Sequence, residues 1–236
     1  MDPNDLRRRR LWIECGVILA LFYLPEIWYA GLSYFDPLIV ARRAPWVSGL
    51  GSSLRDISLL APVVFIIWVS GDPISLFGLR RFGWLRSVPL MVGSFMFYFV
   101  FAFGVRWFYA ALAPSELQYS AHVYLASSRT MPTDLFSLSL RLVDLVLAVF
   151  IEEFVWRGYA ISRLQELTGR FWVAAILSSA MFASYHIYEG SQMLPTAFGI
   201  GLVFALCRRA TNSIWPGYIA HLAIDVCIVI RVSHLR

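Results

Sequence analysis

Long apolar stretches follow one another along the chain, and short polar stretches separate them. Within each stretch the apolar residues are continuous and do not alternate with polar ones, so the pattern is not that of a strand. Several stretches approach or exceed the roughly 20 residues that a helix needs to cross a bilayer. The pattern predicts an all-α polytopic membrane protein with seven transmembrane helices, and eight is the alternative count. The predicted spans are about residues 11–32, 54–70, 88–112, 134–164, 171–188, 193–207 and 214–230.

Turn-forming and interfacial residues occupy the polar segments between these spans. Residues 33–53 and residues 113–133 each hold two prolines, so both are predicted to be loops. Residues 71–86 mix aromatic and basic side chains, which is typical of a segment that lies on the membrane surface, here the cytoplasmic one. We find no internal repeat and no second domain in the sequence. It therefore predicts a single integral membrane domain over residues 1–236.

The composition supports this class, because 59% of the residues are hydrophobic and 15% are charged. The net charge of +5 comes from 20 arginines, since the sequence contains no lysine. No pattern of interleaved basic and aromatic residues indicates nucleic-acid binding. With the N-terminus in the cytoplasm, eleven arginines fall in inner segments and seven in outer ones, which is the expected bias. Exclusive use of arginine is typical of a GC-rich genome, which favours a prokaryotic source. For a polytopic helical protein of such a cell we expect the inner membrane as the location.

Two adjacent carboxylates and a guanidinium interrupt the fourth predicted span. Ionisable groups at membrane depth are a functional hypothesis by default, because burying charge in hydrocarbon is costly. Arg157 follows Glu153 by four residues, so the two are predicted to form an ion pair on one helix face. Glu152 points about 100° away from Glu153 on an ideal helix and is free to face the bundle interior. Glu152 is therefore the predicted chemical carboxylate, with Glu153 and Arg157 supporting it. The same spacing argument predicts an ion pair between Arg141 and Asp144.

The fourth and fifth spans form a predicted hairpin that brings a histidine to the same depth. Gly169 is the expected helix stop between them. Glu152 lies 17 residues before Gly169 and His186 lies 17 residues after it. The two side chains should therefore lie at about the same depth in an antiparallel hairpin. Phe182 precedes His186 by one helical turn.

The last predicted span carries a second histidine, and His221 shares a helix face with Asp225 because they are four residues apart. A glutamate with one histidine can activate water as a general base, while a second histidine with an aspartate can polarise a carbonyl. Glu152, His186 and His221 also match the ligand set of a catalytic zinc. The residues leave zinc and a metal-free mechanism equally open. The three cysteines show no metal-ligand spacing.

Three motifs follow in order: E-E-x-x-x-R from Glu152, F-x-x-x-H from Phe182 and H-x-x-x-D from His221. Together they resemble the motifs of the CPBP (CAAX protease and bacteriocin-processing) intramembrane proteases, which include the type II CAAX prenyl endopeptidases. A myxosortase-like member also fits the resemblance. The motif-bearing catalytic core spans about residues 135–230, the last four predicted helices. One departure is Asp225, because the third motif often ends in asparagine, and an ionised carboxylate cannot donate a hydrogen bond.

The resemblance implies an intramembrane endopeptidase that hydrolyses a peptide bond in a membrane-tethered or lipidated substrate. The cleavage would be of the CAAX type or the processing of a C-terminal sorting tail. Glu152 and His186 would activate the water, while His221 and Asp225 would hold the oxyanion or help to bind a metal. Glu153, Arg157 and Phe182 would support the site.

Two other functions fit parts of the pattern. The first is a membrane immunity or binding protein that keeps the fold without catalysis, and the second is a small transporter whose glutamates and histidines relay protons. Every chemical position of the three motifs is present, which disfavours the first. The absence of internal repeats and of paired broken helices in the sequence disfavours the second.

Overall fold

The apolar stretches of the chain form helices in the structure, a computed structural model that describes residues 3–35, 45–129, 131–132 and 134–234. Between the α-helices lie two π-helices, η1 and η3, and two 3-10 helices, η2 and η4. The described residues include no strand. The elements are α1 (Pro3–Ile18), η1 (Leu19–Tyr23), α2 (Leu24–Phe35), α4 (Pro45–Ser70), η2 (Ile74–Phe77), α5 (Trp84–Leu112), α6 (Pro114–Arg129), α7 (Leu135–Glu152), η3 (Glu153–Ala160), α8 (Ile161–Thr168), α9 (Phe171–Ser184), η4 (Tyr185–Glu189), α10 (Met193–Thr211) and α11 (Trp215–Ser233).

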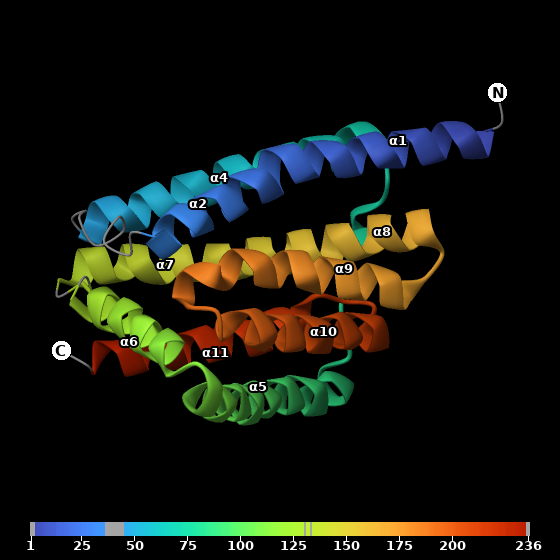
Figure 1. Ribbon diagram of the computed structural model, residues 1–236. Coiled ribbons are helices and arrows are strands. Elements are labelled where there is room, and N and C mark those ends of the chain that lie inside the picture. Colours follow the sequence, from blue (N-terminus) through green and yellow to red (C-terminus); the bar gives the residue numbers. More distant parts are fainter. Residues whose placement is uncertain (1–2, 36–44, 130, 133, 235–236) are drawn as a thin grey trace.

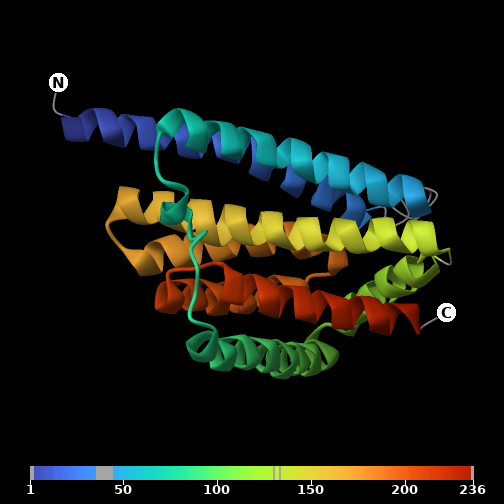
Figure 2. The same ribbon diagram turned by 180° about the vertical axis from the view of Figure 1, so that it is seen from behind.

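Six helical segments of the described chain are long and apolar enough to cross a membrane. The continuous helix made by α7, η3 and α8 runs beside them and is more charged. These segments confirm the prediction of an all-α polytopic membrane protein. The N- and C-terminal ends of the described chain lie at opposite ends of the bundle (Figures 1 and 2). The six apolar segments are Asp5–Phe35, Leu50–Ser70, Trp84–Leu112, Phe171–Glu189, Met193–Thr211 and Trp215–Val232.

The helices run side by side along one elongated bundle (Figure 1). Helices α1, α2 and α4 cover one side and α5 covers the opposite side, with α7, α9, α10 and α11 between them. Large side chains such as Trp156, Phe182 and Phe204 are buried in this middle layer. Outward-facing side chains of α5, including Phe103 and Trp107, are exposed and apolar, as a lipid-facing surface requires. The motif-bearing helices therefore form the core of the bundle.

Residues 113–133 were expected to be a loop, and this expectation is wrong, because α6 lies within them. Pro114 stands at its first position, where the missing N–H costs nothing. The polar residues of α6 bind the turn between η4 and α10. Glu116 Oε2 accepts hydrogen bonds from the amide (3.2 Å) and the hydroxyl (2.7 Å) of Ser191. The Tyr119 hydroxyl donates to the Tyr188 carbonyl (3.1 Å). The polar residues that suggested a loop thus form hydrogen bonds with backbone groups at the η4–α10 turn.

Residues 71–86 do not lie wholly on the surface, since Phe77 in η2 is completely buried. Its ring stacks on Tyr159 of η3, with ring centroids 5.6 Å apart. Gly158 permits this approach, because a Cβ atom there would lie 2.6 Å from the Phe77 carbonyl oxygen. The segment therefore fixes η3 in place from outside the bundle.

An ion-pair network ties the same end of the bundle together. The buried guanidinium of Arg163 on α8 lies 2.9 Å from Glu14 Oε2 on α1 and 2.7 Å from Asp72 Oδ2 in the α4–η2 connection. Burial of the Asp72 carboxyl raises its pKa, but hydrogen bonding and charge from Arg163, with the charge of Arg7, outweigh burial and lower the pKa below its usual value. The network fixes the position of α8, which continues the motif-bearing helix.

Candidate active site

The backbone changes from α- to π-helix at Glu153, immediately after the first motif residue. At the end of η3 the Trp156 carbonyl accepts from the amide of Ile161, five residues later. It also accepts a hydrogen bond of 2.7 Å from the Ser178 hydroxyl on α9, which joins the two helices. Short π-helical segments occur frequently at functional sites. The first motif therefore lies on a locally widened helix that is bonded to its neighbour.

The Glu153 side chain is completely buried and contacts two groups, the Arg157 guanidinium and the His221 imidazole. Its Oε1 atom is 3.2 Å from Nη1 of Arg157, which confirms the ion pair predicted from their spacing. The same oxygen is 3.0 Å from Nδ1 of His221 on α11. The Arg157 guanidinium lies over the Phe182 ring, 4.1 Å from its centroid. Because both members of the ion pair are buried, removing either charge would leave the other uncompensated.

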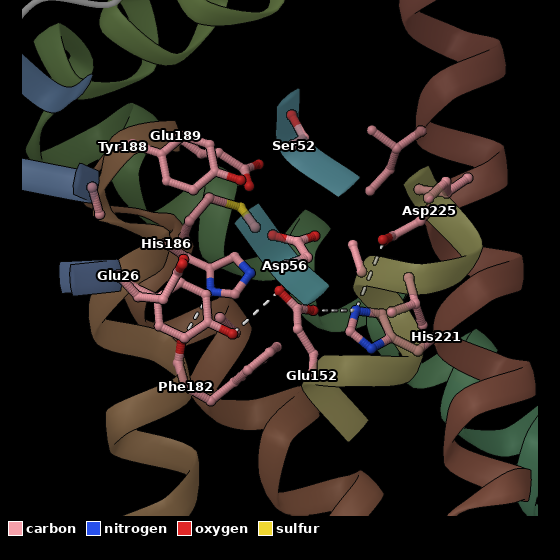
Figure 3. A pocket seen from close by; sticks show the side chains of 18 of the residues that line it. Glu26, Ser52, Asp56, Glu152, Phe182, His186, Tyr188, Glu189, His221 and Asp225 are labelled. Carbon is pink, nitrogen blue, oxygen red and sulfur yellow. Dashed lines mark hydrogen bonds and ion pairs between the residues drawn. The ribbon is translucent and has the colours of Figure 1, made fainter. Parts of the chain in front are cut away.

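Glu152 differs from Glu153 in that its side chain is 24% exposed and reaches a cavity. The Tyr185 hydroxyl on η4 donates to Glu152 Oε1 (3.2 Å) and accepts from Trp156 Nε1 (3.0 Å). The second carboxylate oxygen, Oε2, is 3.7 Å from Nε2 of His221. Figure 3 shows the Glu152 carboxylate directed toward the His221 ring. Glu152 therefore lines the cavity while Glu153 is buried, so the two carboxylates point in different directions, as helix geometry predicted.

His186 lies on η4 and its ring is fixed on both faces. Nδ1 is 2.8 Å from the Phe182 carbonyl oxygen. Since a carbonyl can only accept, Nδ1 carries the hydrogen and Nε2 presents a lone pair. The ring packs against Phe182 (centroids 4.6 Å apart) and stacks on Tyr185 (4.7 Å). Its Nε2 atom is therefore able to accept a proton or a hydrogen bond.

His221 is surrounded by carboxylates on three sides. Besides Glu153 at Nδ1 and Glu152 at Nε2, Asp225 Oδ1 lies 3.9 Å from Nε2. Phe204 packs on the ring, with centroids 5.2 Å apart. The spacing of His221 and Asp225 in the sequence predicted this shared face. The carboxylates orient the imidazole so that Nε2 is directed to the same cavity as Glu152.

A cavity of about 360 Å³ contains all four predicted catalytic residues. It receives side chains from α2, the first half of α4, α5, α6, α7, α9, η4, α10 and α11, and none from α1, η3 or α8. It therefore extends from Glu152 toward the end of the bundle away from the N-terminus. Glu152 and His186 share this cavity, but no hydrogen bond joins them among the described residues. The four residues are Glu152, His186, His221 and Asp225.

The zinc alternative was tested on the arrangement of these side chains. In the described residues no three His, Cys, Asp or Glu side chains are placed so that they could hold a metal ion. His186 is one of the three ligands considered from the sequence, and among the described residues no hydrogen bond joins its side chain to Glu152 or His221. The donor set does not fit zinc, and we derive no catalytic step through a metal.

Sequence reasoning missed several polar residues of the cavity, among them Tyr185 and Glu189. Tyr185, the hydrogen-bond partner of Glu152, was not singled out, although the hairpin register that located His186 also locates its neighbour. Glu189 lies one turn beyond His186 and lines the cavity. No spacing rule identifies it, because it depends on where η4 turns.

Comparison with models of protein families supports the motif-based interpretation. Residues 134–227 match the family described as type II CAAX prenyl endopeptidase Rce1-like. No curated protein and no solved structure is similar enough to the chain to count as a match. The matched segment contains the three motifs and the four predicted catalytic residues. Over residues 134–227 the chain is therefore similar to the type II CAAX prenyl endopeptidases, which supports the resemblance that the three motifs indicate.

Proposed function

We propose that the protein is a glutamate-type intramembrane endopeptidase in which Glu152 activates the attacking water. One observation carries this proposal: Glu152 reaches a cavity at membrane depth, with a tyrosine hydroxyl on one carboxylate oxygen and an imidazole near the other. A carboxylate held in this way can act as a general base without moving. The buried ion pair of Glu153 and Arg157 supports the helix that presents it.

In the proposed reaction, Glu152 takes a proton from a water molecule whose second hydrogen bond goes to His186 Nε2. The hydroxide attacks the carbonyl carbon of the peptide bond. His221 in its protonated form donates from Nε2 to the oxygen on which negative charge develops. Asp225 acts through His221, since an ionised carboxylate cannot donate to that oxygen. The carbon–nitrogen bond then breaks, and the leaving nitrogen receives the proton that Glu152 took from water.

The substrate is proposed to be a peptide attached to the membrane, either lipidated in the CAAX manner or anchored by a C-terminal sorting tail, as in a myxosortase-like enzyme. The resemblance in three motifs and the family match support this class. We also propose an inner-membrane location in a prokaryote with the N-terminus in the cytoplasm, supported by the excess of inner arginines. In that orientation the cavity extends toward the outer face, so substrates would enter from that side.

The test uses purified protein in liposomes with a prenylated peptide and with a peptide anchored by an apolar C-terminal tail. We expect wild-type protein to release a shorter product from at least one of them. Glu152→Gln and His186→Ala should reduce the rate at equal folded yield, by about 10²-fold or more for the general base. Asp5→Asn, which removes an exposed carboxylate outside the cavity, is the matched control. Undiminished cleavage by Glu152→Gln would overturn the assignment of the base.

A chelator separates the two mechanisms that the sequence left open. We expect cleavage to continue at an unchanged rate after chelation, because the donor set does not fit a metal. Loss of activity on chelation, restored by zinc, would contradict the metal-free mechanism and leave the peptidase function in place.

A further inference from the structure

The cavity beside Glu152 contains more acidic than basic side chains. Of the described residues that line it, six are carboxylates and two are arginines. This excess of negative charge lies within a membrane-spanning bundle, where uncompensated charge is costly. The carboxylates are Glu26, Asp56, Asp144, Glu152, Glu189 and Asp225, and the arginines are Arg55 and Arg141.

Both arginines are already engaged by carboxylates at one end of the cavity. Arg55 lies 3.0 Å from Asp56 Oδ1 and 3.6 Å from Glu26 Oε1. Arg141 lies 3.1 Å from Asp144 Oδ2. These ion pairs leave no arginine to compensate the remaining carboxylates of the cavity.

The carboxylates that lack an arginine partner surround the reaction site. Within the described chain, no arginine forms an ion pair with Glu152, Glu189 or Asp225. In Figure 3 Glu189 and Asp225 lie on opposite sides of the cavity, with Glu152 below them. A cation that entered the cavity beside Glu152 would therefore meet a carboxylate on either side.

A second, independent feature of the cavity also indicates a polar ligand. Ser33 on α2 lines the cavity, is 4% exposed, and its Oγ atom has no hydrogen-bond partner among the residues that the structure describes. A buried hydroxyl without a partner costs free energy that a bound polar group would recover. The volume of about 360 Å³ lies within the range of sites that bind small ligands and is sufficient for a long side chain.

We propose that this cavity is a subsite for a basic side chain, lysine or arginine, of the substrate peptide, with Glu189 as the residue that selects it. The inference rests on the proposed peptidase function and adds to it the chemistry of the residue beside the cleaved bond. Glu189 binds the cation, and Asp225 contributes negative charge from the opposite wall. Such a cavity fits a membrane-anchored peptide with a basic residue next to the cleaved bond better than a peptide with a neutral or acidic residue at that position.

The test compares three membrane-anchored peptides that differ only at the residue beside the cleaved bond: arginine, glutamine or glutamate. For the wild type we expect kcat/KM for the arginine peptide to exceed that for the glutamine peptide by about ten- to a hundredfold, the range of one charge-assisted contact. Glu189→Gln should reduce this ratio to within about threefold. Glu189→Arg should reverse it in favour of the glutamate peptide. Asp5→Asn, outside the cavity, should keep the wild-type ratio.

The ratios report selectivity and do not depend on the amount of folded protein. Equal cleavage of all three peptides by the wild type would overturn this inference and leave the peptidase function intact. Retention of the arginine preference in Glu189→Gln would overturn the assignment to Glu189. If the wild type cleaves none of the peptides, the proposed function itself fails, and the inference fails with it.

Discussion

The Tyr185 hydroxyl is the contact that sequence reasoning did not find, and its removal in Tyr185→Phe gives a sharp test. The hydroxyl donates to Glu152 Oε1 at 3.2 Å, which is long for an O–H···O bond. A hydrogen bond to a charged group is worth about 1.5–3 kcal/mol, and the length places this one near the lower end. A loss of about 1–2 kcal/mol corresponds to a roughly five- to thirtyfold lower rate. Because the Tyr185 hydroxyl contacts the carboxylate that we propose as the base, we expect kcat to fall and KM to stay the same.

The same substitution has a separate effect on stability. Trp156 Nε1 donates to the Tyr185 hydroxyl at 3.0 Å, and Trp156 is buried. Leaving that N–H without an acceptor costs about 1–3 kcal/mol in the free energy of unfolding. Thermal unfolding, followed by tryptophan fluorescence in detergent, should therefore show a lower Tm for Tyr185→Phe. Rates must be compared well below this Tm.

The matched control is Tyr218→Phe on the same protein. The Tyr218 hydroxyl lies 3.5 Å from the Val146 carbonyl, too far for a strong hydrogen bond. Its removal should leave kcat and KM unchanged. Wild-type kcat in Tyr185→Phe, with the lowered Tm present, would refute the idea that the hydroxyl positions Glu152.

Three further predictions concern the support of the site. Gly158→Ala should lower Tm, since its Cβ atom would lie 2.6 Å from the Phe77 carbonyl oxygen, and such overpacking costs about 1–3 kcal/mol. Arg157→Met should destabilise the fold by about 3–5 kcal/mol because it removes the guanidinium of a buried ion pair and leaves Glu153 with only His221 as a partner, which thermal unfolding would reveal. The lowered pKa of Asp72 stabilises the fold at pH values above its ordinary pKa of about 3.9, and this stabilisation is lost as pH falls through the lowered value. Asp72→Asn should therefore flatten the dependence of Tm on pH between about 2 and 5; an unchanged slope would contradict the assignment.

The fold was predictable where hydrophobic runs determine it. Each run long enough to cross a bilayer became a helix, because hydrocarbon leaves the backbone no other hydrogen-bond partner. The polar segments expected to be loops are the exceptions, since α4 begins at Pro45, within residues 33–53, and α6 lies within residues 113–133. Glu116 and Tyr119 bind the η4–α10 turn, and a sequence does not show that a distant turn needs such partners.

The site was predictable where its contacts are local. The pairs Glu153–Arg157 and His221–Asp225 follow from spacing on one helix. Contacts between helices were not predictable in this way. The hairpin register placed Glu152 and the η4 segment at one depth, but it could not distinguish His186 from its neighbour Tyr185 as the hydrogen-bond partner.

The acidic cavity was not predictable from the sequence either, because its residues lie far apart along the chain. Glu26 and Asp56 line it because α2 packs on η4 and α4 packs on α7. Taken alone in the sequence, Glu26 and Asp56 each have an ordinary structural explanation. Glu26 lies near the end of a predicted span, and Asp56 is adjacent to Arg55. Their common function emerges only when the helices are assembled.

In the proposed mechanism Glu152 activates the water and Glu153 supports the fold. The most direct measurement is the single-turnover cleavage rate of an anchored peptide by Glu152→Gln and Glu153→Gln, each with its Tm. We predict that Glu152→Gln loses about 10²-fold or more in rate at an unchanged Tm. Glu153→Gln should instead lower Tm, because Arg157 is left without its buried partner. Cleavage by Glu152→Gln at a rate near that of the wild type would contradict the account.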